Sequence, residues 1–215
     1  MRRAIDLNLL HEGQHGSIPR RKALDPIMLT QLTTDLSRVL KHDFAWFDND
    51  ASSLCYDRII VALGMLAACK CGMPINAIRT HTEALFFVKY TVKTMYGISE
   101  ENYHGTVFEP LFGTGQGSGA SPSVWLSLVV ILLQTLDRLI PDRVNFSCPS
   151  GAVTHKRLAD AFVDDTALCF TSSSNETLYE QLVTKLQHIA QTWENLLFLS
   201  GCKLNLSKCS RYILR

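Results

Sequence analysis

The sequence predicts an α+β fold, in which a mostly antiparallel sheet packs against helices on one face. Two observations lead to this prediction. Long segments with apolar residues at helical spacing are separated by short β-prone runs. The resulting order, β-α-α-β-α-ββ-α-β, contains adjacent helices and adjacent strands, and it lacks the regular β-α alternation of a parallel sheet.

The composition of the chain limits which classes of protein it can belong to. The chain has 215 residues, of which 47% are hydrophobic, so it can bury a core, and global disorder is excluded. The formal charge of +1 is weak for a nucleic-acid binder, although residues 1–22 are locally basic. The apolar run 124–133 is too short to cross a membrane. Seven cysteines without Cys-x-x-Cys spacing predict reduced thiols in an intracellular protein, in nucleus or cytoplasm.

The elements of the first half follow from helix-start and helix-stop signals. Residues 1–22 are expected to be irregular, and Asp25-Pro26 opens a helix as N-cap and first residue. Its expected core-facing stripe is Ile27, Leu29, Leu32, Leu36, Val39 and Leu40. Residues 44–47 form a strand that ends in Asp48-Asn49-Asp50. Helices are predicted over 57–69 and 76–96, and residues 105–112 are expected to be extended.

The second half begins with a glycine-rich segment, 113–119, and Ser121-Pro122 then starts a helix that reaches residue 139. A hairpin is predicted near 156–170. Ser173 and Glu176 form a capping box for the last helix, which Gly201 ends. Its core stripe is Leu178, Leu182, Leu186, Ile189, Trp193 and Leu197.

The expected hairpin carries an acidic pair, Asp164-Asp165, at its tip. A two-residue turn favours Asn-Gly or Asp-Gly, because its central residues need positive φ. Adjacent carboxylates also repel each other unless a cation lies between them. Taken alone, an ordinary solvated acidic turn explains the pair equally well. Asp50, at the end of an earlier strand, offers a third carboxylate, and a two-metal site needs carboxylates from separate strands.

These residues lie in five blocks that together resemble the reverse transcriptase domain of a retroelement, closest to the non-LTR retrotransposon type. The blocks match the family's order and extend over nearly the whole chain. They are Gln14 to Arg21, Asp50 to Ile59 with Tyr56-Asp57, Gly115-Gln116-Gly117 with Ser121-Pro122, Phe162-Val163-Asp164-Asp165, and Gly201 to Asn205 with Lys208. The third and fourth blocks are specific at this separation, whereas the first and last are weak singly.

The resemblance implies RNA-directed DNA polymerase activity: a nucleotidyltransferase that uses two Mg²⁺ ions, with Mn²⁺ as a substitute, an RNA template, a DNA primer and deoxynucleoside triphosphates. It implies that Asp50, Asp164 and Asp165 bind the metals and that Lys208 donates a proton to pyrophosphate. It further implies that Tyr56 is the steric gate against ribonucleotides. Substrate contacts are implied for Gln116, Gly117, Arg20 and Arg21. Each of these residues also has a purely structural alternative. Tyr56 would be a core residue, the segment around Gln116 a flexible loop, and the arginines and Lys208 solvated surface residues.

The resemblance also implies a domain organisation. Residues 1–42 would be partial fingers, and residues 43–215 a palm with interleaved fingers helices. The chain ends soon after Lys208, so the thumb region that follows in the family is missing, and the chain looks like a fragment of a longer polyprotein. One spacing departs from the family. Ala51 to Cys55 separate Asp50 from Tyr56, one residue more than usual.

Two other functions were weighed. Gly115 to Ala120 fits a dinucleotide-binding fingerprint, but the downstream acid, Asp137, falls inside a predicted helix rather than after a second strand, so that fingerprint fails. The stronger alternative is a catalytically inactive, degenerate retroelement fragment that at most binds nucleic acid. The extra residue after Asp50 and the weak net charge favour it.

Overall fold

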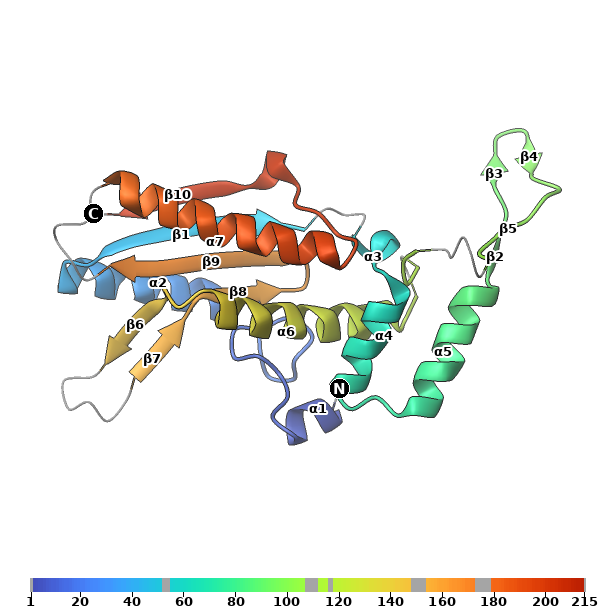
Figure 1. The fold of residues 1–215 in the computed structure, drawn as a ribbon, viewed down its shortest axis with the longest axis horizontal. Coiled ribbons are helices and arrows are strands. Elements are labelled where there is room, and N and C mark those ends of the chain that lie inside the picture. Colours follow the sequence, from blue (N-terminus) through green and yellow to red (C-terminus); the bar gives the residue numbers. More distant parts are fainter. Residues whose placement is uncertain are drawn as a thin grey trace.

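The computed structural model describes residues 2–51, 55–106, 112–115, 118–147, 154–172 and 179–214. Its centre is a four-stranded antiparallel sheet in the order β10-β1-β9-β8 (Figure 1). The strands of this sheet are β1 (Asp43–Asp50), β8 (Ala159–Phe162), β9 (Asp165–Ser172) and β10 (Ser210–Leu214). The predicted α+β class is confirmed.

Helices cover both faces of the sheet, whereas the sequence predicted helices on one face only. The long helices α6 (Ser121–Leu139) and α7 (Tyr179–Leu199) pack on one face, and α2 (Leu24–Leu40) lies across the other face. The predicted core stripe of α7 is confirmed from Leu182 onward, since Leu182, Leu186, Ile189, Trp193 and Leu197 are all buried. The main core therefore lies between the sheet and the α6–α7 layer.

The orientation of α2 differs from the prediction. The apolar side chains expected to face the core are largely exposed, and Val39 reaches 77% exposure, whereas Thr33 and Ser37 are buried. The reason is a buried guanidinium. Arg157 donates hydrogen bonds to the hydroxyl groups of Thr30 and Thr33, so the polar side of the helix turns inward.

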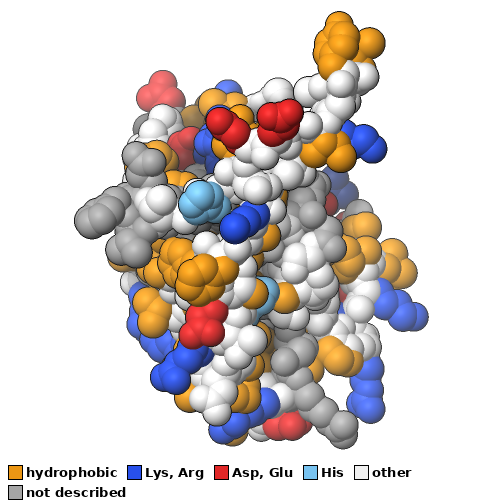
Figure 2. Space-filling model, turned by 90° about the vertical axis from the view of Figure 1, so that its right-hand side faces the viewer, with side chains coloured by type: hydrophobic (Ala, Val, Ile, Leu, Met, Phe, Trp, Pro, Cys, Tyr) orange, Lys and Arg blue, Asp and Glu red, His pale blue; other side chains and the backbone are white. Residues whose placement is uncertain are grey.

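The predicted helix over 76–96 is also wrong in its second half. Helix α5 (Ile75–Phe87) ends early, and the chain continues into one projecting arm (Figure 1). In this arm β2 (Lys89–Tyr90) pairs with β5 (Tyr103–His104) at the base, and β3 (Lys93–Thr94) pairs with β4 (Gly97–Ile98) at the tip. Val88, Tyr90 and Val92 favour extended backbone, and this preference overrides the helical pattern. Exposed apolar side chains, including Tyr96 at 92% exposure, gather on this projection (Figure 2).

The remaining elements connect these layers. The predicted helix 57–69 is divided into α3 (Cys55–Arg58) and α4 (Val61–Lys70), and α4 packs against α6. A hairpin that the sequence did not indicate is formed by β6 (Val144–Ser147) and β7 (Thr154–Arg157). The first helix is α1 (Arg2–Asp6), and a 3₁₀ turn η1 (Leu206–Lys208) precedes β10. The predicted capping box at Ser173 and Glu176 lies outside the described residues, as does most of the segment 105–112.

Among the described residues, α6 is the one helix long and apolar enough to cross a membrane. More than half of its most apolar window is buried inside the protein. Its side chains from Val124 to Leu136 supply much of the core, so the apolar character of α6 is accounted for by packing.

Candidate active site

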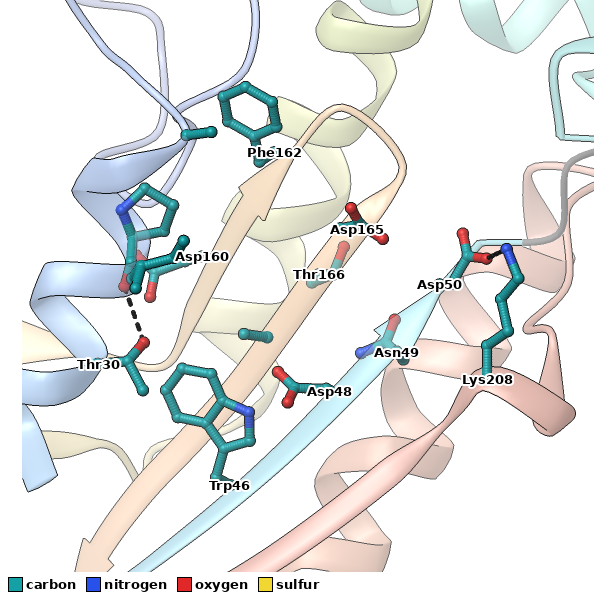
Figure 3. A pocket seen from close by; sticks show the side chains of 14 residues that line it. Thr30, Trp46, Asp48, Asn49, Asp50, Asp160, Phe162, Asp165, Thr166 and Lys208 are labelled. Carbon is teal, nitrogen blue, oxygen red and sulfur yellow. Dashed lines mark hydrogen bonds and ion pairs between the residues drawn. The ribbon is translucent and has the colours of Figure 1, made fainter.

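Two carboxylates from neighbouring strands meet at one end of the sheet. Asp50 is the last residue of β1, Asp165 is the first residue of β9, and the two are directly paired across the ladder. Directly opposed residues project from the same face of an antiparallel sheet. Figure 3 shows both side chains on the side that faces α2. The sheet thus brings Asp50 and Asp165 to within one inter-strand spacing, about 4.8 Å between strands.

Asp164 lies in the turn between β8 and β9, and the turn is shifted by one residue from the prediction. Its two central residues are Val163 and Asp164, because Phe162 and Asp165 already form the closing pair. Val163 has a φ of 62°, and Asp164 does not share this positive φ, which is the pattern of a type II′ turn. A β-branched residue there is strained by about 1–3 kcal/mol. The backbone oxygen of Asp164 accepts a hydrogen bond of 3.1 Å from Ala51.

Lys208 binds the first carboxylate. Its Nζ lies 2.5 Å from Oδ2 of Asp50, although Lys208 itself is mostly exposed (Figure 3). The backbone holds this arrangement, because the amide of Asn205 donates to the carbonyl oxygen of Asp50 at 3.0 Å. Leu204 also pairs with Ala51. The last sequence block is therefore joined to the end of β1.

The electrostatics show that negative charge is concentrated at this end of the sheet. Burial, followed by the charges of Asp164 and Asp50, raises the pKa of Asp165. The pKa of Lys208 is also raised, mainly by its hydrogen bond and charge interaction with Asp50. Because neighbouring negative charges help to raise the pKa of Asp165, a cation bound at this end of the sheet would lower the electrostatic energy.

A pocket of about 440 Å³ opens beside these carboxylates, between α2 and the sheet. Asp50, Asp165 and Lys208 line one end, and Trp46 and Phe162 add apolar surface (Figure 3). Asp48 also lines it, and burial raises the pKa of this carboxyl. Asp48 is not among the metal ligands expected from the sequence. The period-two alternation of a strand, which puts Asp48 and Asp50 on one face, was the available signal.

Tyr56 lies on the short helix α3, next to the glycine-rich segment. The carbonyl oxygen of Tyr56 accepts a hydrogen bond of 2.8 Å from the amide of Thr114, and its ring centroid lies 5.7 Å from that of Trp125. The ring is partly buried against the main core. Gln116 and Gly117 lie outside the described residues, as do residues 52–54, which contain much of the longer spacer after Asp50.

The first sequence block runs beside the hairpin. Arg20 is exposed and has a φ of 68°, and Arg21 donates hydrogen bonds to the carbonyl oxygens of Glu12 and Gln14. The Arg21 side chain therefore stabilises the loop to which it belongs. His15 is buried, with Nε2 3.1 Å from Oδ1 of Asp160.

Asp160 also binds Arg157, and both side chains are 3% exposed. The Arg157 guanidinium lies over the Trp46 ring, with Cζ 5.6 Å from its centroid. These contacts join the first block, α2 and the hairpin through one buried ionic network. No local sequence pattern indicates this network, because its residues come from distant segments.

The carboxylates at this end of the sheet are of the ligand type that divalent cations prefer. Carboxylate oxygens are the ligands that Mg²⁺ prefers, and the Lys208 ammonium group already supplies a positive charge to Asp50. Across the described ranges, however, no three His, Cys, Asp or Glu side chains converge closely enough to hold a metal ion. The strands bring the carboxylates of Asp50 and Asp165 to the same end of the sheet without bringing a third such side chain close enough to complete a metal site among the described residues.

Comparison with solved structures places this fold. The chain matches apo telomerase from Candida tropicalis truncated from its C-terminal domain, with 16% identity and a TM-score of 0.57 over 100% of this chain and 40% of that chain. It matches telomerase from Candida albicans in complex with a fragment of telomeric RNA, with 11% identity and a TM-score of 0.62 over 99% and 34%. A further apo structure from Candida tropicalis gives 13% identity and a TM-score of 0.61 over 98% and 36%.

The chain therefore has the fold of a part of telomerase, and it spans 34–40% of the length of these chains. No protein-family model matches the sequence, and no curated protein matches it. The retroelement type expected from the sequence blocks is not among these structural matches, which are telomerases.

Proposed function

We propose that this chain is the polymerase core of a reverse transcriptase-like nucleotidyltransferase, which extends a DNA primer on an RNA template with deoxynucleoside triphosphates. The observation that carries the proposal is the pairing of Asp50 with Asp165 at the open end of the sheet, with Asp164 in the adjoining turn. The telomerase-like fold supports it, because the sequence blocks and the fold lead to the same chemistry independently.

In this proposal Asp50, Asp164 and Asp165 would hold two Mg²⁺ ions, whose charge would stabilise the attacking and leaving oxygens of the phosphoryl transfer. Asp50 and Asp165 are fixed by the ladder, so their spacing is set by the backbone rather than by a mobile loop. The Lys208 ammonium group, which now pairs with Asp50, would be the proton donor for the departing pyrophosphate once metal binding engages that carboxylate.

Tyr56 would lie under the sugar of the incoming nucleotide. Its ring is anchored by Trp125, and its backbone by Thr114, so it can act as a fixed wall against a 2′-hydroxyl group. Gln116 and Gly117 are proposed to contact the nucleotide and the template, and Arg20 the triphosphate. Arg21 is available for that role only after releasing the carbonyl oxygens that it binds.

The experiment is primer extension by the purified chain on an RNA template with Mg²⁺, beside the variant Asp164→Asn. The amide keeps the size of the side chain and removes one of the crowded carboxylates, so the fold should persist while extension is lost. Circular dichroism checks the fold. The proposal fails if the variant extends the primer at the wild-type rate.

The alternative is an inactive fragment that at most binds nucleic acid. The lack of three converged metal ligands among the described residues favours it. The two proposals differ in metal binding. An active site gives thermal stabilisation by Mg²⁺ or Mn²⁺ that Asp164→Asn abolishes. An inactive fragment shows template binding without any such metal effect.

A further inference from the structure

The turn that carries Asp164 contains a strained residue that neighbouring groups hold in place. Val163 adopts a φ of 62°, which β-branched residues rarely do. Glycine is the usual residue at the first central position of a type II′ turn. Val163 therefore needs contacts from the surrounding structure to keep this conformation.

One such contact comes from α6. Trp125 is 3% exposed, and its indole Nε1 donates a hydrogen bond of 2.6 Å to the carbonyl oxygen of Val163. That oxygen belongs to the peptide unit that joins Val163 to Asp164, so the bond fixes the orientation of the peptide plane just before Asp164.

A second contact comes from the first sequence block. The segment 13–16 lies along the edge of β8, where His15 donates to the carbonyl oxygen of Ala161 at 2.8 Å and Ala161 donates to that of Gly13 at 2.7 Å. At Gly16 this segment reaches the turn, and a Cβ on Gly16 would lie only 2.5 Å from the amide nitrogen of Val163. The backbones approach so closely that only glycine fits.

We propose that Trp125 and Gly16 are positioning residues that clamp Val163 in its left-handed conformation and so aim Asp164 toward Asp50. The consequence of the clamp, which is the placement of a metal-binding carboxylate, rests on the proposed function. The role of Gly16 and Trp125 is to hold the backbone of the turn at Val163. Both act through the backbone of the turn, without touching the substrate.

The test combines Trp125→Phe with Val163→Gly. Phenylalanine keeps an aromatic ring beside Tyr56 and removes the N–H donor together with part of the indole volume, a loss that the control variant below shares. Without metal or substrate, Trp125→Phe should speed hydrogen exchange of the amides in 161–166 by about tenfold, the usual effect of one lost hydrogen bond. Mn²⁺ affinity, measured by electron paramagnetic resonance, should fall by a similar factor. Adding Val163→Gly should restore both, because glycine accepts positive φ without a clamp.

Trp193→Phe is the matched control. It removes another buried indole donor, which binds Oδ1 of Asn49 at 3.0 Å instead of the turn, so exchange in 161–166 should stay at the wild-type rate. If Trp125→Phe does not fold, Gly16→Ala tests the clamp from its other side with the same readouts.

Two results would overturn the clamp: wild-type turn exchange in both Trp125→Phe and Gly16→Ala, or loosening that Val163→Gly fails to correct. A wild-type chain that neither binds Mn²⁺ nor extends a primer would refute the proposed function alone, because turn exchange is measured without either ligand.

Discussion

Lys208 and Asp50 form an ion pair across the opening of the candidate active site, with Nζ and Oδ2 2.5 Å apart. Asp50 is largely buried, whereas Lys208 reaches it from the surface. The pair satisfies a carboxylate that adjoins two further acidic residues, Asp164 and Asp165. A divalent cation that binds Oδ2 of Asp50 would compete with this ammonium group.

Replacing Lys208 should therefore separate metal binding from catalysis. Lys208→Gln removes a competitor for Asp50, so Mn²⁺ affinity should rise by up to about fivefold, the range of an exposed ion pair. Primer extension should fall because the proton donor is lost. Metal titration and single-turnover extension measure the two effects. Lys185→Gln, which breaks a surface pair with Asp142, should change neither. Unaltered metal affinity in Lys208→Gln would contradict this competition.

The raised pKa of Asp165 predicts a pH-dependent stability. A carboxyl whose folded-state pKa lies above its unfolded value of 3.8 destabilises the fold as pH rises through the folded pKa, and it imposes no penalty below 3.8. Without metal, Asp165→Asn should therefore raise the melting temperature at pH 7, and the difference should disappear as pH falls toward 3.8. Thermal unfolding across this pH range checks the sign. A variant less stable than wild type at pH 7 would refute the repulsion.

Tyr56 should control sugar selection. Tyr56→Ala opens the space beside Trp125, so incorporation of ribonucleotides should increase relative to deoxyribonucleotides, while Tyr56→Phe should keep the wild-type preference. Competitive single-nucleotide extension gives the ratio of kcat/KM for the two sugars. Equal selectivity in all three proteins would remove Tyr56 from the nucleotide site.

The buried network around Asp160 should matter for stability more than any surface pair. Asp160→Asn leaves the Arg157 guanidinium buried without its counter-charge, and this should lower the free energy of unfolding by about 3–5 kcal/mol. Urea titration measures the loss. Asp35→Asn, in an exposed pair with Arg38, is the control and should change the free energy by less than about 1 kcal/mol. A small effect at Asp160 would mean that water reaches Arg157.

The sequence by itself determined the elements whose local signals agree with their packing. The apolar stripe of α7 and the apolar run of α6 both lie in the core. Apolar residues that recur about every 3.6 positions form one face of a helix, and this face is the one that packs against the sheet. Strand β1 and the hairpin that carries Asp164 and Asp165 were also predicted correctly, because short β-prone runs mark their strands, although the turn lies one residue earlier than predicted.

The side of α2 that faces inward depends on long-range contacts, because the partner of its threonines is Arg157, more than a hundred residues away. The tertiary structure also sets the pairing of Asp50 with Asp165, the capture of Asp50 by Lys208, and the left-handed Val163 held by Trp125 and Gly16. Each is a contact between segments distant in sequence. Local propensity carries no information about such contacts, so the sequence supplied the acidic residues and the fold supplied their arrangement.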